Sequence, residues 1–152
     1  MKLSKKQTNY LCKGRVGRLA TFDSADSLHL VPIVYACLGN KIYFVVDRKK
    51  KQTGRTLKRV RNISENGKAT LLVDNYSEDW KKLSYLMIYC RATIIGPEDN
   101  YREKRLAAKK LKEKYYQYEK DDYFPEKIDK AVFVRLEPQR AIFWQNLRHS
   151  VG

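Results

Sequence analysis

Two strand-like segments separated by only two residues constrain the fold of this chain more than any other feature. Residues 28–38 are rich in Val, Ile and Tyr, residues 41–47 continue with an apolar run, and Gly39-Asn40 lies between them. A two-residue connection of Gly and Asn is typical of a tight β-hairpin. Strands joined by such short turns run antiparallel, because a parallel crossover needs a dozen or more residues. We therefore expect an antiparallel sheet.

The rest of the chain extends this pattern. Further strands are predicted over residues 15–22, 68–74, 83–95, 130–136 and 140–145. Helices are predicted from Ser4 to about Cys12, from Thr53 or Thr56 to about Ser64, and over residues 100–118, where apolar residues recur every four positions. The expected fold is mainly β with flanking helices (α+β), an antiparallel sheet of six or seven strands that closes into a barrel. With 152 residues, the chain is expected to form a single domain over residues 1–152.

The charge is unevenly distributed along the chain. The 32 Lys and Arg residues exceed the 17 Asp and Glu residues, which gives a formal net charge of +15. Eight of the cations fall between residues 48 and 61 with no acid among them. Such an excess indicates an anionic partner, which can be nucleic acid, a membrane surface or a phosphorylated ligand.

The position of this basic cluster favours a phosphate site. The apolar strand that ends at Val46-Asp47 leads directly into a lysine run, and a helix start follows. Lysine ammonium groups and the free N–H groups of a first helical turn both bind phosphate, and Arg55 adds a guanidinium that can bind it in a bidentate manner. A solvated basic loop is the alternative.

Several other classes of protein do not fit the sequence. No apolar run approaches the roughly 18 residues of a membrane span, and the polar start of the chain predicts no signal peptide, so we expect a cytoplasmic protein. Three cysteines far apart and two histidines, His29 and His149, predict neither a disulfide framework nor a metal site. Neither a nucleotide-binding glycine loop nor a nucleophile elbow is present. If the protein is an enzyme, a bound cofactor supplies the chemistry.

The order of these motifs is similar to that of a known family. Residues 18–21 (RLAT), an Asp-containing turn, residues 29–34 (HLVPIV), the hairpin, residues 42–47 and the lysine run follow one another, and residues 61–63, 72–74 and 77–80 continue the series. Over roughly residues 14 to 145 the chain resembles the pyridoxamine 5′-phosphate oxidase-like FMN-binding split-barrel family. Within it, the chain most resembles the small branch that uses the deazaflavin coenzyme F-420.

The resemblance implies a homodimer with a cofactor, FMN or F-420, in each groove between the subunits. It implies that the strand holding Val31, Pro32 and Ile33 runs along the isoalloxazine ring. The strand end and basic loop over residues 46–51 would hold the phosphate, with Lys49 and Lys51 as its ligands and Thr53 and Arg55 next in line. Val46 and Asp47 are then also expected to contact the cofactor. Trp80 would reach the groove of the other subunit.

The chain also departs from the oxidases that give the family its name. His29 stands where they place an arginine for the phosphate, and the C-terminal segment that binds pyridoxine is absent, since the sequence stops at Gly152. We therefore expect a hydride-transferring oxidoreductase acting on a small organic substrate other than vitamin B6, with catalytic residues that the sequence does not identify. The alternatives are a cofactor-binding protein without turnover and a basic β-barrel that binds nucleic acid, although strand aromatics that form no stacking face argue against the latter.

Overall fold

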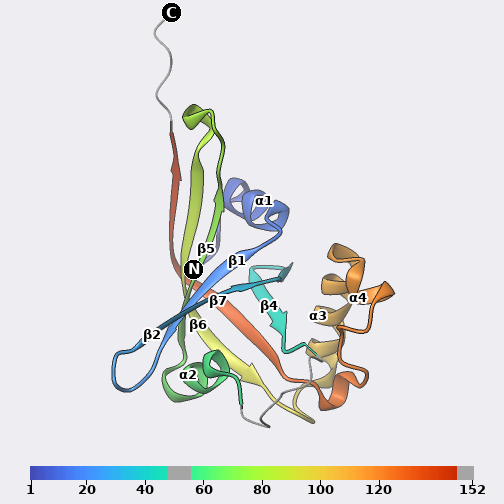
Figure 1. The fold of residues 1–152 in the computed structure, drawn as a ribbon. Helices are drawn as coiled ribbons and strands as arrows, with labels where there is room; N and C mark the ends of the chain where they lie inside the picture. The colour runs from blue at the N-terminus through green and yellow to red at the C-terminus, as the bar shows by residue number, and fades with distance from the viewer. Residues whose placement is uncertain (48–55, 147–152) are drawn as a thin grey trace, which may run out of the picture.

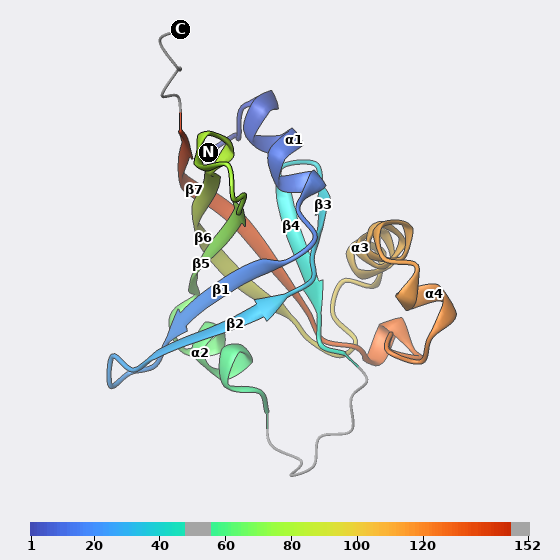
Figure 2. The same cartoon turned by 45° about the horizontal axis from the view of Figure 1, so that its top comes forward.

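The computed structural model describes residues 1–47 and 56–146, and these residues form a seven-stranded antiparallel sheet that curls into a half-open barrel (Figures 1 and 2). The order of strands across the sheet is β2-β1-β5-β6-β7-β4-β3. The strands are β1 (Gly17–Phe22), β2 (Leu28–Ile33), β3 (Ala36–Leu38), β4 (Lys41–Val45), β5 (Lys68–Asn75), β6 (Ser84–Ile95) and β7 (Phe133–Gln145). The predicted antiparallel split barrel with flanking helices is confirmed.

Four α-helices and two short 3-10 turns accompany the strands in the described residues. They are α1 (Lys5–Lys13), α2 (Lys58–Asn66), α3 (Tyr101–Lys114), α4 (Gln117–Lys120), η1 (Trp80–Lys82) and η2 (Ile128–Lys130). Ser4 caps α1 as predicted, and the Gln7 side-chain oxygen accepts a hydrogen bond from the Ser4 backbone N–H, which completes a capping box.

Two predicted helix boundaries are wrong. Helix α2 begins after Leu57 with no side-chain cap, so Thr56 does not cap it, and Thr53 lies outside the described residues. The helix predicted over residues 100–118 ends at Lys114, and α4 follows as a separate short helix. The reason lies at Tyr115, whose extended backbone places its ring in the core and its hydroxyl against the backbone oxygens of Arg15 and Tyr35.

Two predicted strand assignments also differ from the structure. Residues 28–38 form two strands, β2 paired with β1 and β3 paired with β4, because the chain turns from one edge of the barrel to the other between Ile33 and Ala36. The two strands predicted on either side of Pro138 are one continuous strand, β7. The register shift opposite Tyr89 and Cys90 is a β-bulge, and Pro138 lies beside it, where a missing N–H is tolerated.

The buried side chains form two clusters, one on each side of the wall made by β3, β4 and β7. The larger fills the barrel and includes Leu19, Phe44 and Leu71. The smaller, which includes Tyr43, Leu111 and Phe133, packs α3 and α4 against the wall, as Figure 2 shows. Lys104 is fully buried at this layer, where its ammonium group donates to three backbone carbonyls, those of Gly96, Asp129 and Ala131. Apolar contacts and the fully hydrogen-bonded ammonium group of Lys104 thus both anchor the helices on this side of the wall.

Candidate functional site

A cavity of about 240 Å³ opens where β2, β4, α2 and α4 meet. Its apolar wall comes from the end of β2 and from β4, and its polar wall comes from Asp47, Arg59 and Tyr118. Among the described residues, the lining is Val16, Pro32, Ile33, Val34, Phe44, Val45, Asp47, Arg59 and Tyr118. Within that part of the chain, the cavity therefore combines an apolar wall with one cation and one carboxylate.

Arg59 is the unusual residue of this cavity. It belongs to the first turn of α2, its Nε is buried, and this atom has no hydrogen-bond partner among residues 1–47 and 56–146. Burial lowers the pKa of the guanidinium below its usual value, although the nearby Asp47 and Tyr118 act in the opposite direction. A buried donor without an acceptor costs free energy, so this arginine is poised to bind an anion.

Asp47 and Tyr118 form the other polar pair. The Tyr118 hydroxyl donates to the Asp47 carboxylate at 2.7 Å. Burial and this carboxylate both raise the pKa of Tyr118, so the phenol stays protonated and keeps donating to Asp47. Neither group has the properties of a free general base.

The structure brings three of the predicted site residues to the cavity: Pro32, Ile33 and Asp47. Val31 packs against the barrel core, and His29 is half-buried on β2 opposite Thr21. Val46 lies just outside the cavity, where its N–H donates to the Val132 carbonyl at 3.0 Å and completes the barrel wall. The strand end thus lies beside the cavity.

Trp80 lies elsewhere. It belongs to η1, in the connection between β5 and β6, and its side chain is 65% exposed. Figure 1 shows this connection at the opposite end of the long strands from α2. Trp80 is therefore not brought to the cavity of its own chain.

Four predicted phosphate ligands, Lys49, Lys51, Thr53 and Arg55, lie outside the described residues. Arg59 and Tyr118 line the cavity although the sequence did not identify them as site residues. Arg59 is a member of the basic cluster over residues 48–61, and its place in the first turn of a helix was the available signal. Tyr118 falls at the end of the helix predicted over residues 100–118, where nothing in the sequence pattern distinguishes it.

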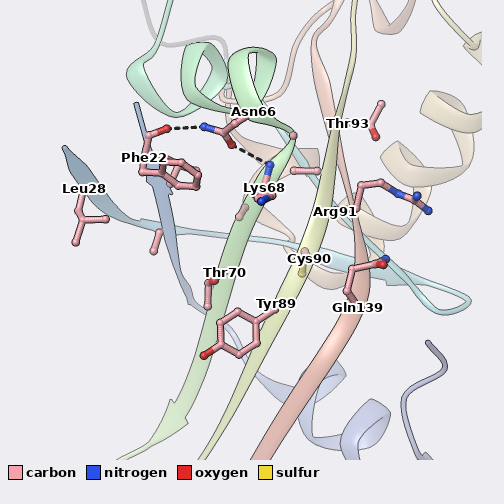
Figure 3. A pocket seen from close by; sticks show the side chains of 15 residues that line it. Phe22, Leu28, Asn66, Lys68, Thr70, Tyr89, Cys90, Arg91, Thr93 and Gln139 are labelled. Carbon is pink, nitrogen blue, oxygen red and sulfur yellow. Dashed lines mark hydrogen bonds between the residues drawn. The ribbon is translucent and has the colours of Figure 1, made fainter. Parts of the chain in front are cut away.

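The outer face of the sheet carries a second concavity, which we call the outer groove. It runs across β1, β5 and β6, has a volume of about 750 Å³, and is lined mostly by apolar atoms. Figure 3 shows Phe22, Leu28 and Tyr89 on this face, together with the Asn66 side chain, which donates to the Phe22 carbonyl and accepts from the Lys68 N–H. Leu28 is 84% exposed, so the face presents apolar surface to the outside.

The fold and the cavity define a split barrel with an arginine-lined cavity at the end of its strands. The sequence profile of the pyridoxamine 5′-phosphate oxidase family matches residues 3–145. The chain therefore belongs to the pyridoxamine 5′-phosphate oxidase family. No curated protein matches the sequence.

Solved structures share the fold at low sequence identity. A conserved hypothetical protein of Mycobacterium tuberculosis superposes with a TM-score of 0.72 at 17% identity, covering 99% of this chain and 92% of its own. A FAD-binding protein of Mesorhizobium loti gives 0.65 at 18% identity, with coverage of 91% and 92%. The heme storage protein HutZ of Vibrio cholerae gives 0.68 at 12% identity, with coverage of 98% and 100%. Proteins with different bound groups thus share this barrel.

Two further observations bear on the class of protein. Within the described ranges, no helix is both long and apolar enough to cross a membrane. In the same ranges, no three His, Cys, Asp or Glu side chains gather where they could hold a metal ion.

Proposed function

We propose that this protein binds a flavin-type cofactor, FMN or the deazaflavin F-420, and transfers a hydride between it and a small organic substrate. The observation that carries the proposal is the buried Nε of Arg59, which lies beside an apolar wall and has no hydrogen-bond partner in the part of the chain that the structure describes. A phosphorylated ring compound has the two matching parts, an anion and a flat apolar body.

Arg59 fits the acidic part of such a cofactor. An anion at the guanidinium would give the buried Nε–H an acceptor and offset the burial of the charge. The lysine run over residues 49–51 immediately follows β4 and Asp47 in sequence and would add further cations. Asp47 already accepts a hydrogen bond from Tyr118, and its negative charge favours the charged form of the Arg59 guanidinium.

The apolar wall fits the ring. Pro32 and Ile33 are neighbours at the end of β2, and Phe44 and Val45 extend the surface at the end of β4. These side chains would orient the ring and exclude water from one of its faces. The bound cofactor would supply the hydride chemistry, which agrees with a cavity whose acid and phenol are engaged with each other.

The basic cluster suits either cofactor. FMN carries one phosphate, whereas F-420 carries a phosphodiester and a tail of carboxylates that would engage more of the cations between residues 48 and 61. Residues in the cavity do not discriminate between the two, so the proposal covers their shared chemistry.

The proposed site requires a second copy of the chain. A cavity of about 240 Å³ falls below the roughly 300 Å³ at which ligand pockets begin. The outer groove and the exposed Leu30, at 68% exposure, present apolar side chains that a second copy of the chain would cover. In such a homodimer, Trp80 from one subunit would complete the cavity of the other.

Spectroscopy of the purified protein tests the proposal. We expect flavin or deazaflavin absorbance, or uptake of added FMN or F-420 with micromolar or tighter affinity, and mass spectrometry of the released ligand identifies which one. Light scattering should give the mass of a dimer. A protein that takes up neither cofactor but binds hemin or single-stranded nucleic acid would refute the proposal. Substrate reduction assays then separate an enzyme from a protein that binds its cofactor without turnover.

A further inference from the structure

Helix α3 carries positive charge that the proposed cofactor site does not use. Seven of its 14 residues are Lys or Arg and two are Glu, which gives the helix a net charge of +5. It packs against β3, β4, η2 and α4, and Figures 1 and 2 both show it apart from α2. None of its residues is among those that line the cavity of Arg59 or the outer groove. The charge of α3 thus belongs to neither of these sites.

Both acids of α3 are already engaged. The Glu103 carboxylate accepts hydrogen bonds from the Arg135 guanidinium at 2.8 Å and from the Tyr43 hydroxyl at 2.6 Å. The Glu113 carboxylate lies 3.7 Å from the Nζ of Lys110. These pairs use one cation of the helix and leave no acid of α3 to neutralise the others.

Three further cations of α3 serve its packing on the barrel. The buried Lys104 donates to three backbone carbonyls, as described above. The Nζ of Lys112 lies 4.9 Å from the centroid of the Phe124 ring, and that of Lys114 lies 3.9 Å from the centroid of the Tyr35 ring. An ammonium group over an aromatic ring is attracted to its face, so these charges stabilise the fold.

The remaining cations, Arg102, Arg105 and Lys109, form what we call the α3 row. All three are exposed, and their side chains make no hydrogen bond or ion pair within residues 1–47 and 56–146. Their spacing of three and four residues places them within about 60° of one another around the helix and about 10 Å apart from end to end. Three like charges in such a row repel one another, and a partner with a row of negative charges would offset this repulsion.

An exposed aromatic ring lies at each end of α3. Tyr101 is the first residue of the helix and is 52% exposed, and Tyr116, just beyond its end, is 64% exposed. An exposed ring of this kind can stack on an unpaired base. A membrane-surface helix instead needs an apolar face free to enter the lipid, whereas Ala107, Ala108 and Leu111 of α3 are buried in the protein. Cations between two free rings therefore favour single-stranded nucleic acid over a membrane.

We propose that α3 binds single-stranded nucleic acid, with the α3 row on successive phosphates and with Tyr101 and Tyr116 stacked on bases. Such binding depends little on base sequence, because every base has a stacking face and every nucleotide has a phosphate. The surface is separate from the cavity of Arg59, so the protein binds a strand and a cofactor at the same time. The inference does not rest on the identity of the cofactor.

The first experiment measures the phosphate contacts. The affinity of the full-length protein for a fluorescein-labelled oligothymidylate of about 12 nucleotides is followed by anisotropy over a range of salt concentrations. The variant carries Arg102→Gln, Arg105→Gln and Lys109→Gln together. We expect it to bind roughly 30- to 100-fold more weakly at about 0.1 M salt. Its plot of log affinity against log salt should be less steep by about 2, at roughly 0.7 for each lost contact with a single strand.

A matched control separates this row from the general positive charge of the chain. Lys2→Gln, Lys5→Gln and Lys81→Gln together remove the same charge from exposed residues at and beside α1 and in η1. This control should lose less than about threefold in affinity beyond the small effect of net charge. Equal losses in the two triple variants would show that nucleic acid meets only a diffuse positive surface, which would overturn the proposal.

The second experiment tests the rings. Tyr101→Ala and Tyr116→Ala should each weaken the single strand about tenfold and leave a duplex of the same length unaffected, because the bases of a duplex are already stacked. Tyr76→Ala is the control, since Tyr76 is 65% exposed in the connection between β5 and β6. Unchanged single-strand affinity in both Tyr101→Ala and Tyr116→Ala would remove stacking from the mechanism and overturn the proposal.

Competition experiments separate this inference from the proposed function. Saturating FMN should not displace the oligonucleotide, and the triple variant of the α3 row should keep the wild-type affinity for FMN. Displacement by FMN would place the oligonucleotide at the cofactor site and refute the inference. Binding to phosphatidylserine vesicles without binding to the oligonucleotide would refute it as well. A protein that binds the strand through the α3 row but takes up neither FMN nor F-420 would support the inference and contradict the proposed function.

Discussion

Replacement of Arg59 by Met tests whether this residue serves the fold or a ligand. Methionine retains a long apolar side chain but removes the guanidinium and its buried Nε, which has no hydrogen-bond partner within residues 1–47 and 56–146. If Arg59 serves the fold, its replacement lowers the free energy of unfolding. If it serves an anionic ligand, its replacement weakens cofactor binding and leaves the free energy of unfolding unchanged or raises it. The free protein and the cofactor-bound protein must therefore be measured separately.

The structure sets the magnitude of each response. In the free protein, the variant removes an unsatisfied donor that costs about 1–3 kcal/mol and loses some attraction to Asp47, which keeps its hydrogen bond from Tyr118. We expect the free energy of unfolding to stay within about 1 kcal/mol of the wild type or to rise. In the complex, the variant loses a charge-assisted hydrogen bond of about 1.5–3 kcal/mol, which weakens the cofactor about 10- to 150-fold.

Two measurements and one control decide the question. Urea unfolding of the cofactor-free protein gives the stability, and fluorescence titration with FMN and F-420 gives the affinities. Arg61→Met is the matched control for the FMN titration, because Arg61 is exposed on the same helix, does not line the cavity, and its loss lowers the net charge equally. A loss of more than about 2 kcal/mol in stability, with cofactor affinity unchanged, would refute the reasoning and make Arg59 a structural residue.

The remaining predictions concern the basic loop, the proposed dimer and the response to acid. Replacing Lys49 and Lys51 together by Ala should weaken cofactor binding by a few kcal/mol at ~1–3 for each contact, and an unchanged affinity would place the phosphate elsewhere. Trp80→Ala should weaken dimerisation about 30-fold or more in sedimentation experiments, since a buried Trp contributes ~2 kcal/mol or more to an interface. Burial opposes ionisation of Glu103, but hydrogen bonds and the charge of Arg135 outweigh it and lower its pKa below 4.5. The ionised Glu103 carboxylate therefore stabilises the fold above about pH 4.5, and this contribution is lost as the pH falls through the lowered pKa of the folded state. In urea unfolding, the stability of Glu103→Gln should decrease less with falling pH than that of the wild type.

Much of the fold was predictable because short turns and alternating burial are local signals. The hairpin at Gly39 has the positive φ of 61° that its position requires, and Ser4 caps α1 as its sequence indicates. The predicted helix and strand bounds are wrong where tertiary contacts determine where an element ends. Helix α3 stops before Tyr115 because the Tyr115 hydroxyl forms hydrogen bonds with the backbone of Tyr35. Strand β7 continues through Pro138 because a β-bulge accommodates the proline. The hydrophobic periodicity of the sequence does not reveal contacts between residues so far apart along the chain.

The candidate site was predictable only in part, for a related reason. The end of β2 and Asp47 were identified through their order along the chain, and the structure places Pro32, Ile33 and Asp47 in one cavity. Arg59 and Tyr118 were missed, because a charge in a basic run and a tyrosine after an apolar stripe look ordinary until the fold brings them together. Partners that are 59 residues apart in sequence have no local signature.

The position of the β3–β4 hairpin in the sheet has a consequence for how the chain is made. This hairpin joins the sheet through β7, which is the last strand along the sequence. During synthesis, the apolar side chains of Tyr43, Phe44 and Val45 have no β7 to pack beside until that strand has left the ribosome. Closure of the barrel is therefore a late event with high contact order, and an incompletely translated chain would be prone to aggregate.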